Sequence, residues 1–116
     1  MATLVVDEVR NAAVTPDDNA ANAGGDEYTN NPGTLAWMDN QDGSSTTVTF
    51  VAVKTSVVVP GYGSLTIASI AVAVPATSQR VISIPTTGYN DANGRVQITY
   101  SSVTSLTMNF WRPLSK

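Results

Sequence analysis

The sequence predicts an all-β protein, a small β-sandwich or jelly-roll-like barrel with an extended N-terminal arm. Three observations lead to this fold class. Apolar and polar residues alternate with period two along most of the chain, which is typical of half-buried strands. Clusters of Gly, Asn, Asp and Pro separate the alternating segments, and no segment shows convincing helical periodicity. Short strands joined by such turns are characteristic of sandwiches and barrels, and 116 residues suit a single domain.

The first third of the chain differs from the rest, and we interpret residues 1–33 as an extended arm. A short apolar segment contains Leu4, Val5, Val6 and Val9, and we expect one strand there. A short helix over 7–14, limited by Pro16, is the alternative. Residues 11–33 are dominated by Asn, Ala, Asp and Gly, which bury too little apolar surface to fold independently. Such a segment becomes ordered by lying across a partner.

Residues 34–116 are predicted to form the β-sandwich domain. The clearest strands are 46–54, 95–100 and 105–111, with shorter ones at 34–39 and 79–84. Their inward faces are expected to carry Val48, Phe50, Ala52, Val96, Ile98, Tyr100, Leu106, Met108 and Phe110. The run 64–74 is more continuously apolar and is predicted as one strand covered on both faces. Turns are expected at 39–43, 60–63, 85–88 and 90–94, where Gly or Asn supplies positive φ.

Aromatic residues are assigned by their phase along these strands. Trp37 and Tyr100 are expected in the core, as strand-borne aromatics usually are. Trp111 is out of phase with Leu106, Met108 and Phe110, so it belongs either to a second core layer or to an interface. We favour the interface, where Trp is enriched.

Composition excludes several classes of chemistry. The chain has no Cys and no His, which removes disulfides, Cys/His zinc sites, Cys nucleophiles and His-based triads. The net charge is −3, and residues 1–42 hold eight acidic residues and one basic residue. This asymmetry suits either an acidic arm on a basic partner surface or ordinary solvated charge. The basic residues are few and scattered, so no nucleic-acid partner is predicted.

The remaining polar clusters are interpreted as structural. Asp17–Asp18, Asp26–Glu27 and the pair Asp39 and Asp42 lie in predicted loops without an apolar wall, and are expected to be solvated acids. The segment 91–94 matches only part of a calcium-loop pattern, and Asx turns explain it. We therefore predict no catalytic residue, no metal and no cofactor, and hence no enzyme. No signal peptide and no membrane-spanning segment are expected, so synthesis in a cytoplasm is predicted.

A resemblance to a known group of proteins begins at Gly24-Gly25-Asp26-Glu27-Tyr28-Thr29-Asn30 and continues through Gly33-Thr34-Leu35 and Asn40. It includes Ser45–Thr49, Val72–Ala76, Gln79–Ile82 and Val103–Thr107, and its most specific part is Tyr89-Asn90-Asp91-Ala92-Asn93-Gly94. Over roughly residues 24–110 the chain resembles small structural proteins of tailed bacteriophages. The extension 1–23 and the bulky tail Phe110–Leu114 depart from the pattern of that group.

The resemblance implies a head decoration, or cement, protein. Such a protein would be made in the host bacterial cytoplasm, bind the outer surface of the capsid, and bridge neighbouring major capsid subunits. Its expected partners are the major capsid protein and other copies of itself, as a trimer or dimer. The residues expected at the partner interface are Leu4, Val5, Val6, Tyr28, Arg80, Trp111 and Arg112. A head–tail joining protein, a head-fibre base and a carbohydrate-binding β-module using Trp37, Tyr62 or Trp111 are the alternatives.

Overall fold

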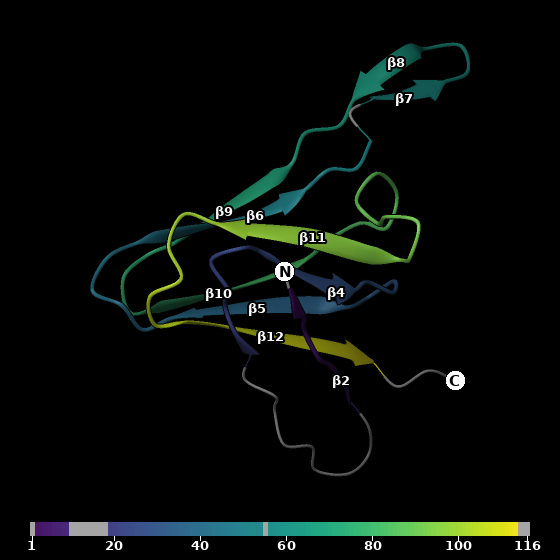
Figure 1. Cartoon of the computed structure of the whole chain (residues 1–116). Coiled ribbons are helices and arrows are strands. Elements are labelled where there is room, and N and C mark those ends of the chain that lie inside the picture. Colours follow the sequence, from purple (N-terminus) through teal and green to yellow (C-terminus); the bar gives the residue numbers. More distant parts are fainter. Residues whose placement is uncertain (1, 10–18, 55, 114–116) are drawn as a thin grey trace.

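The protein is a β-sandwich of two sheets with a separate hairpin projecting from one end (Figure 1). The structure, a computed structural model, describes residues 2–9, 19–54 and 56–113. Sheet A contains, in spatial order, β1 (Ala2–Thr3), β4 (Asp26–Thr29), β11 (Arg95–Tyr100), β6 (Thr46–Val51) and β9 (Ile70–Val74). Sheet B contains β10 (Ser78–Ser83), β5 (Leu35–Asn40), β12 (Leu106–Pro113) and β2 (Val6–Val9), and β3 (Asn19–Ala20) also pairs with β12. The hairpin consists of β7 (Ser56–Val59) and β8 (Gly63–Thr66). The predicted all-β fold class is confirmed, in its sandwich form.

From β4 onward the chain alternates between the two sheets, except that β6 and β9 both belong to sheet A. β4, β6, β9 and β11 belong to sheet A, whereas β5, β10 and β12 belong to sheet B. β6 and β9 are antiparallel neighbours, and the β7–β8 hairpin lies between them in the chain. The hairpin is thus an insertion at the end of the β6–β9 pair, and it projects beyond the sandwich (Figure 1).

The core lies between the inner faces of the two sheets. Tyr28 stacks on Phe110 with ring centroids 4.2 Å apart and meets Phe50 edge-on at 6.4 Å. These three rings join sheet A to sheet B through aromatic contacts of favourable geometry. The other buried apolar side chains are Leu4, Ala36, Met38, Val48, Val74, Ile84, Tyr89, Val96, Ile98, Leu106 and Met108. The alternation predicted for 46–51, 95–100 and 106–110 is therefore confirmed.

The N-terminal segment closes one side of the sandwich. β1 runs parallel to β4 in sheet A, and β2 runs parallel to β12 in sheet B. Between them the chain crosses from one sheet to the other, where the amide of Leu4 donates to the carbonyl of Glu27 at 2.8 Å and the Leu4 side chain is buried. The strand expected over 4–9 is present in part, as β2, and residues 7–9 are therefore extended; residues 10–14 of the alternative helix lie outside the described residues.

The described part of 1–33 is thus built into the sandwich, unlike the separate arm that composition favours. β4 pairs with β11 in sheet A, and Tyr28 contributes a central core ring. The physical reason is that a few residues suffice for insertion: hydrogen bonds to existing strands satisfy the backbone, and single side chains such as Leu4 fill the core. The average composition of a segment does not reveal single residues of this kind, so it predicts a separate arm.

The apolar run 64–74 forms two strands, in contrast to the single buried strand predicted. β8 and β9 are separated at residues 67–69, and all of β8 is exposed. β7 was not anticipated either. Its register with β8, Ser56 opposite Thr66 through Val59 opposite Gly63, makes the pair a sheet of its own. A continuous apolar run is compatible with burial on both faces, but here no second layer covers the described residues of the hairpin.

Candidate interaction surfaces

The residues that carry the resemblance form a hydrogen-bonded framework at the ends of the strands. The Nδ2 of Asn30 donates to the Oδ1 of Asn90 at 2.9 Å, and the Nδ2 of Asn90 donates to the carbonyl of Asn30 at 2.8 Å. Asn30 also donates to the carbonyl of Ile84. These bonds join the segment before β5 to the turn before β11. Asn30 and Asn90 therefore hold these two segments of the chain together.

A second part of the framework surrounds the buried carboxylate of Asp26. It accepts hydrogen bonds from the Tyr100 hydroxyl at 2.6 Å and from the backbone amide and Nδ2 of Asn22 at 3.1 and 2.6 Å. Burial, and then the hydrogen bond to Asp26, raise the pKa of the Tyr100 hydroxyl above its ordinary range. Asp26 was expected to be a solvated loop acid, and the structure corrects this because the carboxylate is fully buried and hydrogen-bonded. Its partners are all neutral donors from within the fold, which indicates a structural role.

Glu27 and Asp91 share a polar cluster on the outer side of sheet A. Arg95 Nη1 lies 2.7 Å from Glu27 Oε2, and the Nε2 of Gln97 donates to both Glu27 and Asp91, at 3.2 and 2.9 Å. Asp91 also accepts from the backbone amides of Asn93 and Arg95. The hydrogen bond from Gln97 is the largest cause holding the pKa of Glu27 below its ordinary value, and the Arg95 amide is the largest for Asp91. Asp91 thus organises an Asx turn, as its sequence context predicts.

The outer face of sheet B presents a group of large apolar side chains, which we call the sheet-B face: Leu35, Trp37, Val81 and Trp111. Val81 pairs with Trp37 across β10 and β5, and Leu35 pairs with Trp111 across β5 and β12. Leu35, Trp37 and Val81 are between 39% and 49% exposed, and Trp111 is half-buried. The indole Nε1 of Trp37 donates to Gln79 at 3.0 Å, which fixes the ring on the surface. Exposed apolar groups with tryptophan on a rigid sheet are typical of protein interfaces.

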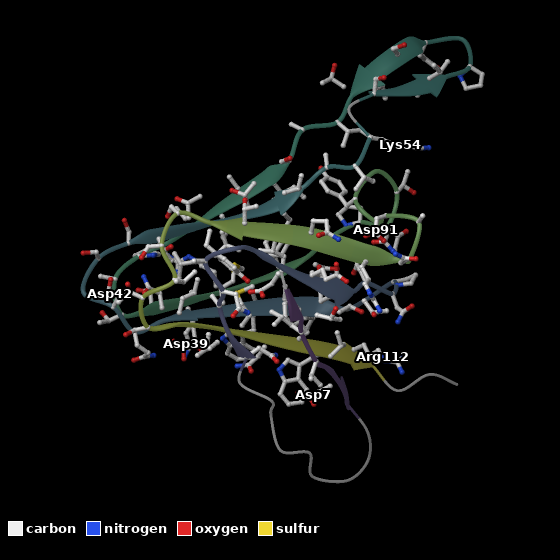
Figure 2. All side chains as sticks on the ribbon, in the orientation of Figure 1. Asp7, Asp39, Asp42, Lys54, Asp91 and Arg112 are labelled. Atoms are coloured by element: carbon white, nitrogen blue, oxygen red, sulfur yellow. The ribbon has the colours of Figure 1, made fainter. Side chains whose placement is uncertain are left out.

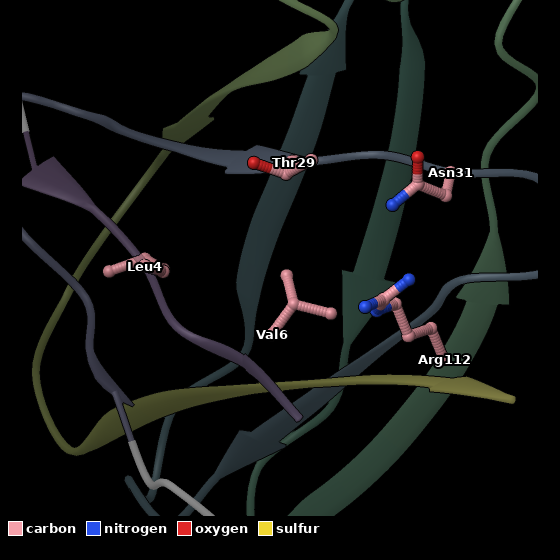
Figure 3. Close-up of a pocket in the computed structure, with 5 residues that line it drawn as sticks. All are labelled: Leu4, Val6, Thr29, Asn31 and Arg112. Atoms are coloured by element: carbon pink, nitrogen blue, oxygen red, sulfur yellow. The ribbon is translucent and has the colours of Figure 1, made fainter. Parts of the chain in front are cut away.

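A pocket of about 250 Å³ lies at the end of the sandwich where the N-terminal segment crosses between the sheets (Figure 3). Leu4 and Val6 supply apolar walls, and Thr29, Asn31 and Arg112 supply a hydroxyl, an amide and a guanidinium group. In Figure 3 the Arg112 side chain extends towards Asn31. These three groups can donate hydrogen bonds, and Arg112 already interacts with another group of the chain. The pocket therefore adds polar groups to the surface beside β12.

The structure brings some predicted interface residues together and separates others. Leu4, Val6 and Arg112 line the pocket, Val5 is exposed next to them, and Trp111 lies on the sheet-B face. Tyr28 is fully buried between aromatic rings, so its side chain forms no part of the surface of the chain. Leu4 also belongs to the core, with 7% exposure. Arg80 is exposed on β10, across sheet B from β2, and its Nη1 donates to the Gln79 carbonyl.

Sequence reasoning missed three members of the sheet-B face, Leu35, Trp37 and Val81. Trp37 was expected in the core, and the structure corrects this: the burial pattern of β5 places Ala36 and Met38 inward and Leu35 and Trp37 outward. The phase of this strand is hard to assign from the sequence, because the polar Asn40 shares the inward phase with Ala36 and Met38. Asn40 is buried because its amide donates to the carbonyls of Ser44, Val74 and Pro75, so a polar residue occupied the inward phase.

Charged side chains gather at the ends of the sandwich. Figure 2 shows Asp39 and Asp42 at one end, Asp91 and Arg112 towards the other, and Lys54 at the base of the hairpin. Among the residues that the structure describes, no group of three or more acidic residues is placed to hold a metal ion. Over the same residues, no helix has the length and apolarity required to cross a membrane. Comparison of the chain with protein-family models, curated proteins and solved structures gives no match.

Proposed function

We propose that this chain is a viral structural protein that binds the outer surface of a phage capsid, bridges neighbouring major capsid subunits and associates with other copies of itself. The observation that carries the proposal is the sheet-B face, with Leu35, Trp37, Val81 and Trp111 on three paired strands. A flat apolar surface of this kind suits a broad protein partner. The resemblance over residues 24–110 supplies the class of partner.

The rest of the fold supports a passive, durable component. The Asn30–Asn90 hydrogen bonds and the hydrogen bonds to the buried Asp26 carboxylate hold loops and strands together. The pocket beside β12, lined by Arg112, Asn31 and Thr29, adds polar groups to the surface of the sandwich. A small rigid module repeated over a shell gains strength from avidity, so each single contact surface need only be moderate.

The carbohydrate-binding alternative has less support from the geometry. Trp37 and Trp111 share the outer face of sheet B, but Tyr62 lies at the turn of the hairpin, which is a separate sheet. These three rings therefore do not form one stacking platform. A head–tail joining or head-fibre base role would use the same protein-binding surface, and copy number separates it from decoration.

The first test is the ratio of this chain to the major capsid protein in purified virions. Decoration predicts a ratio near unity or a simple fraction of it. A ring-like handful of copies would instead assign the chain to a connector or tail, and its absence from virions would refute a virion role altogether.

The second test locates the contact. Trp37→Ala and Val81→Lys should each weaken binding to capsids that lack this chain by about thirtyfold, the effect of losing a buried interface anchor. Thr99→Lys, an exposed strand position on sheet A, is the matched control and should bind as the unaltered chain does. Co-sedimentation measures binding, and circular dichroism confirms folding. Unchanged binding of both sheet-B variants would refute this contact surface.

A further inference from the structure

The β7–β8 hairpin carries the most exposed large apolar side chains of the described residues. Val58 is 73% exposed, Tyr62 86% and Leu65 55%. They occupy both strands and the connecting turn, in which the Tyr62 amide donates to the carbonyl of Val59. Isolated two-stranded hairpins are at best marginally stable in water. The hairpin therefore exposes apolar surface, and packing against a partner would stabilise it.

The base of the hairpin is fixed to the sandwich. The backbone amides of Val53 and Lys54 both donate to the Gly88 carbonyl, at 2.8 and 3.2 Å. In the segment that returns from the hairpin to β9, the Ala68 carbonyl accepts a hydrogen bond from the hydroxyl of the buried Tyr89 at 2.7 Å. These bonds hold both legs of the hairpin against the loop before β11. The hairpin consequently leaves the sandwich in a defined direction (Figure 1).

The same region carries no charge. No Asp, Glu, Lys or Arg occurs between Lys54 and Arg80, a stretch that includes the hairpin and β9. Natural proteins commonly protect exposed strand edges with charged side chains, especially lysine. Within the described residues, β9 is one of the two edge strands of sheet A, and β7 and β8 pair only with each other. These three strands thus offer backbone edges without charged protection.

We propose that the β7–β8 hairpin, together with the adjoining edge of β9, is the surface through which two copies of this chain associate. A two-fold symmetric contact places one surface against itself, so like charges on that surface would meet and repel. The charge-free stretch between Lys54 and Arg80 avoids this repulsion, although the whole chain carries a net charge of −3. A stable pair uses about 20 residues from each copy. The hairpin extended by β9 spans residues 56–74, which is 19 residues with Val74 buried in the core, so this contact would be at the small end of such interfaces.

This inference rests on the self-association included in the proposed function, but its test needs no capsid. The full chain is analysed by sedimentation equilibrium with Val58→Lys and Leu65→Lys as hairpin variants. Thr99→Lys is the matched control, because it adds the same charge at an exposed strand position on sheet A, outside both proposed contact surfaces. We expect the unaltered chain and Thr99→Lys to dimerise alike, and the hairpin variants to raise the dissociation constant at least tenfold. Circular dichroism establishes that each variant is folded.

Other outcomes would overturn the inference. A chain that stays monomeric at about 1 mM does not self-associate to a useful extent. A dimer that the hairpin variants leave intact, or that Thr99→Lys disrupts, would move the contact elsewhere. A monomeric chain whose hairpin variants lose capsid binding would assign the hairpin to a capsid subunit. The capsid tests of Trp37→Ala and Val81→Lys are read separately, so failure of dimerisation and failure of capsid binding remain distinguishable.

Discussion

Tyr28 combines a favourable ring with an unfavourable hydroxyl. Its ring stacks on Phe110, whereas its hydroxyl is buried and has no hydrogen-bond partner among the described residues. Burial raises the pKa of this hydroxyl well above its ordinary value. Removing an unsatisfied polar group while keeping the ring should be neutral or stabilising by about 1 kcal/mol, so we expect this of Tyr28→Phe. Urea unfolding monitored by circular dichroism measures it.

Tyr28→Ala provides the contrast, because it removes the ring as well. The loss of stacking and the cavity left between the sheets should cost about 3–5 kcal/mol. A Tyr28→Phe variant destabilised by more than about 1 kcal/mol would show that the hydroxyl has a stabilising partner in solution.

Glu27 and Asp91 make stability depend on pH. The pKa of Glu27 is lowered from its ordinary 4.5, mainly by the hydrogen bond from Gln97. The pKa of Asp91 is lowered from its ordinary 3.8, mainly by the hydrogen bond from the Arg95 amide. The folded state therefore binds these protons less readily than the unfolded state. Their contribution is complete above about pH 4.5 and is lost as the pH falls through the lowered pKa values. Glu27→Gln and Asp91→Asn should each reduce the fall in melting temperature between about pH 6 and pH 3.

Gln97 tests the same cluster from the donor side. Its Nε2 serves both carboxylates, so Gln97→Leu should also reduce the pH dependence of the melting temperature. All three variants melting with the pH dependence of the unaltered chain would mean that this cluster does not set acid stability.

At the scale of elements, the hairpin base depends on a glycine. Gly88 has φ of +88°, and a Cβ built on it would lie 2.7 Å from Cδ1 of Ile67. Gly94 has φ of +74° but open space around the same position. Gly94→Ala should therefore cost about 1 kcal/mol from backbone strain alone. Gly88→Ala should cost about 1–3 kcal/mol more, because Ile67 must move. Chemical denaturation of both variants checks this difference, and equal costs would contradict the contact with Ile67.

The N-terminal strands show that one element serves several purposes. β1 and β2 cover the edges of β4 and β12, and Leu4 between them enters the core. Deletion of residues 1–23 would remove these strands together with Asn22, a donor to the buried Asp26 carboxylate. Such a deletion would disturb folding as well as any contact with a partner. Substitutions on the sheet-B face separate the two effects, since those side chains point outward.

At the scale of the whole molecule, the sequence predicts the sandwich better than its surfaces. Period-two alternation identifies β6, β11 and β12, because each buries one face against the core. It does not identify the hairpin, because Val58 and Leu65 are apolar yet exposed. Periodicity shows which side chains share a face, but it does not show whether another layer covers that face. Of the residues predicted at the interface, Trp111 lies on the outer face of sheet B, as its phase relative to Phe110 indicates. Tyr28 belongs to a motif that carries the resemblance, and its ring lies in the core.

The two proposed surfaces predict how dimerisation and capsid attachment are coupled. The sheet-B face lies on sheet B, and the hairpin extends from the β6–β9 pair of sheet A, so a dimer joined by hairpins keeps both sheet-B faces available (Figure 1). Two capsid contacts linked in this way bind more tightly than one, by about 10²–10⁴ when the geometry permits both. Val58→Lys should therefore weaken attachment to whole capsids by about 100-fold while leaving its affinity for an isolated capsid subunit unchanged. Val81→Lys should weaken both affinities, for whole capsids and for the isolated subunit. Co-sedimentation measures binding to capsids, and calorimetric titration measures binding to the subunit. A Val58→Lys variant that lowered both affinities equally would show that the hairpin contacts the capsid itself.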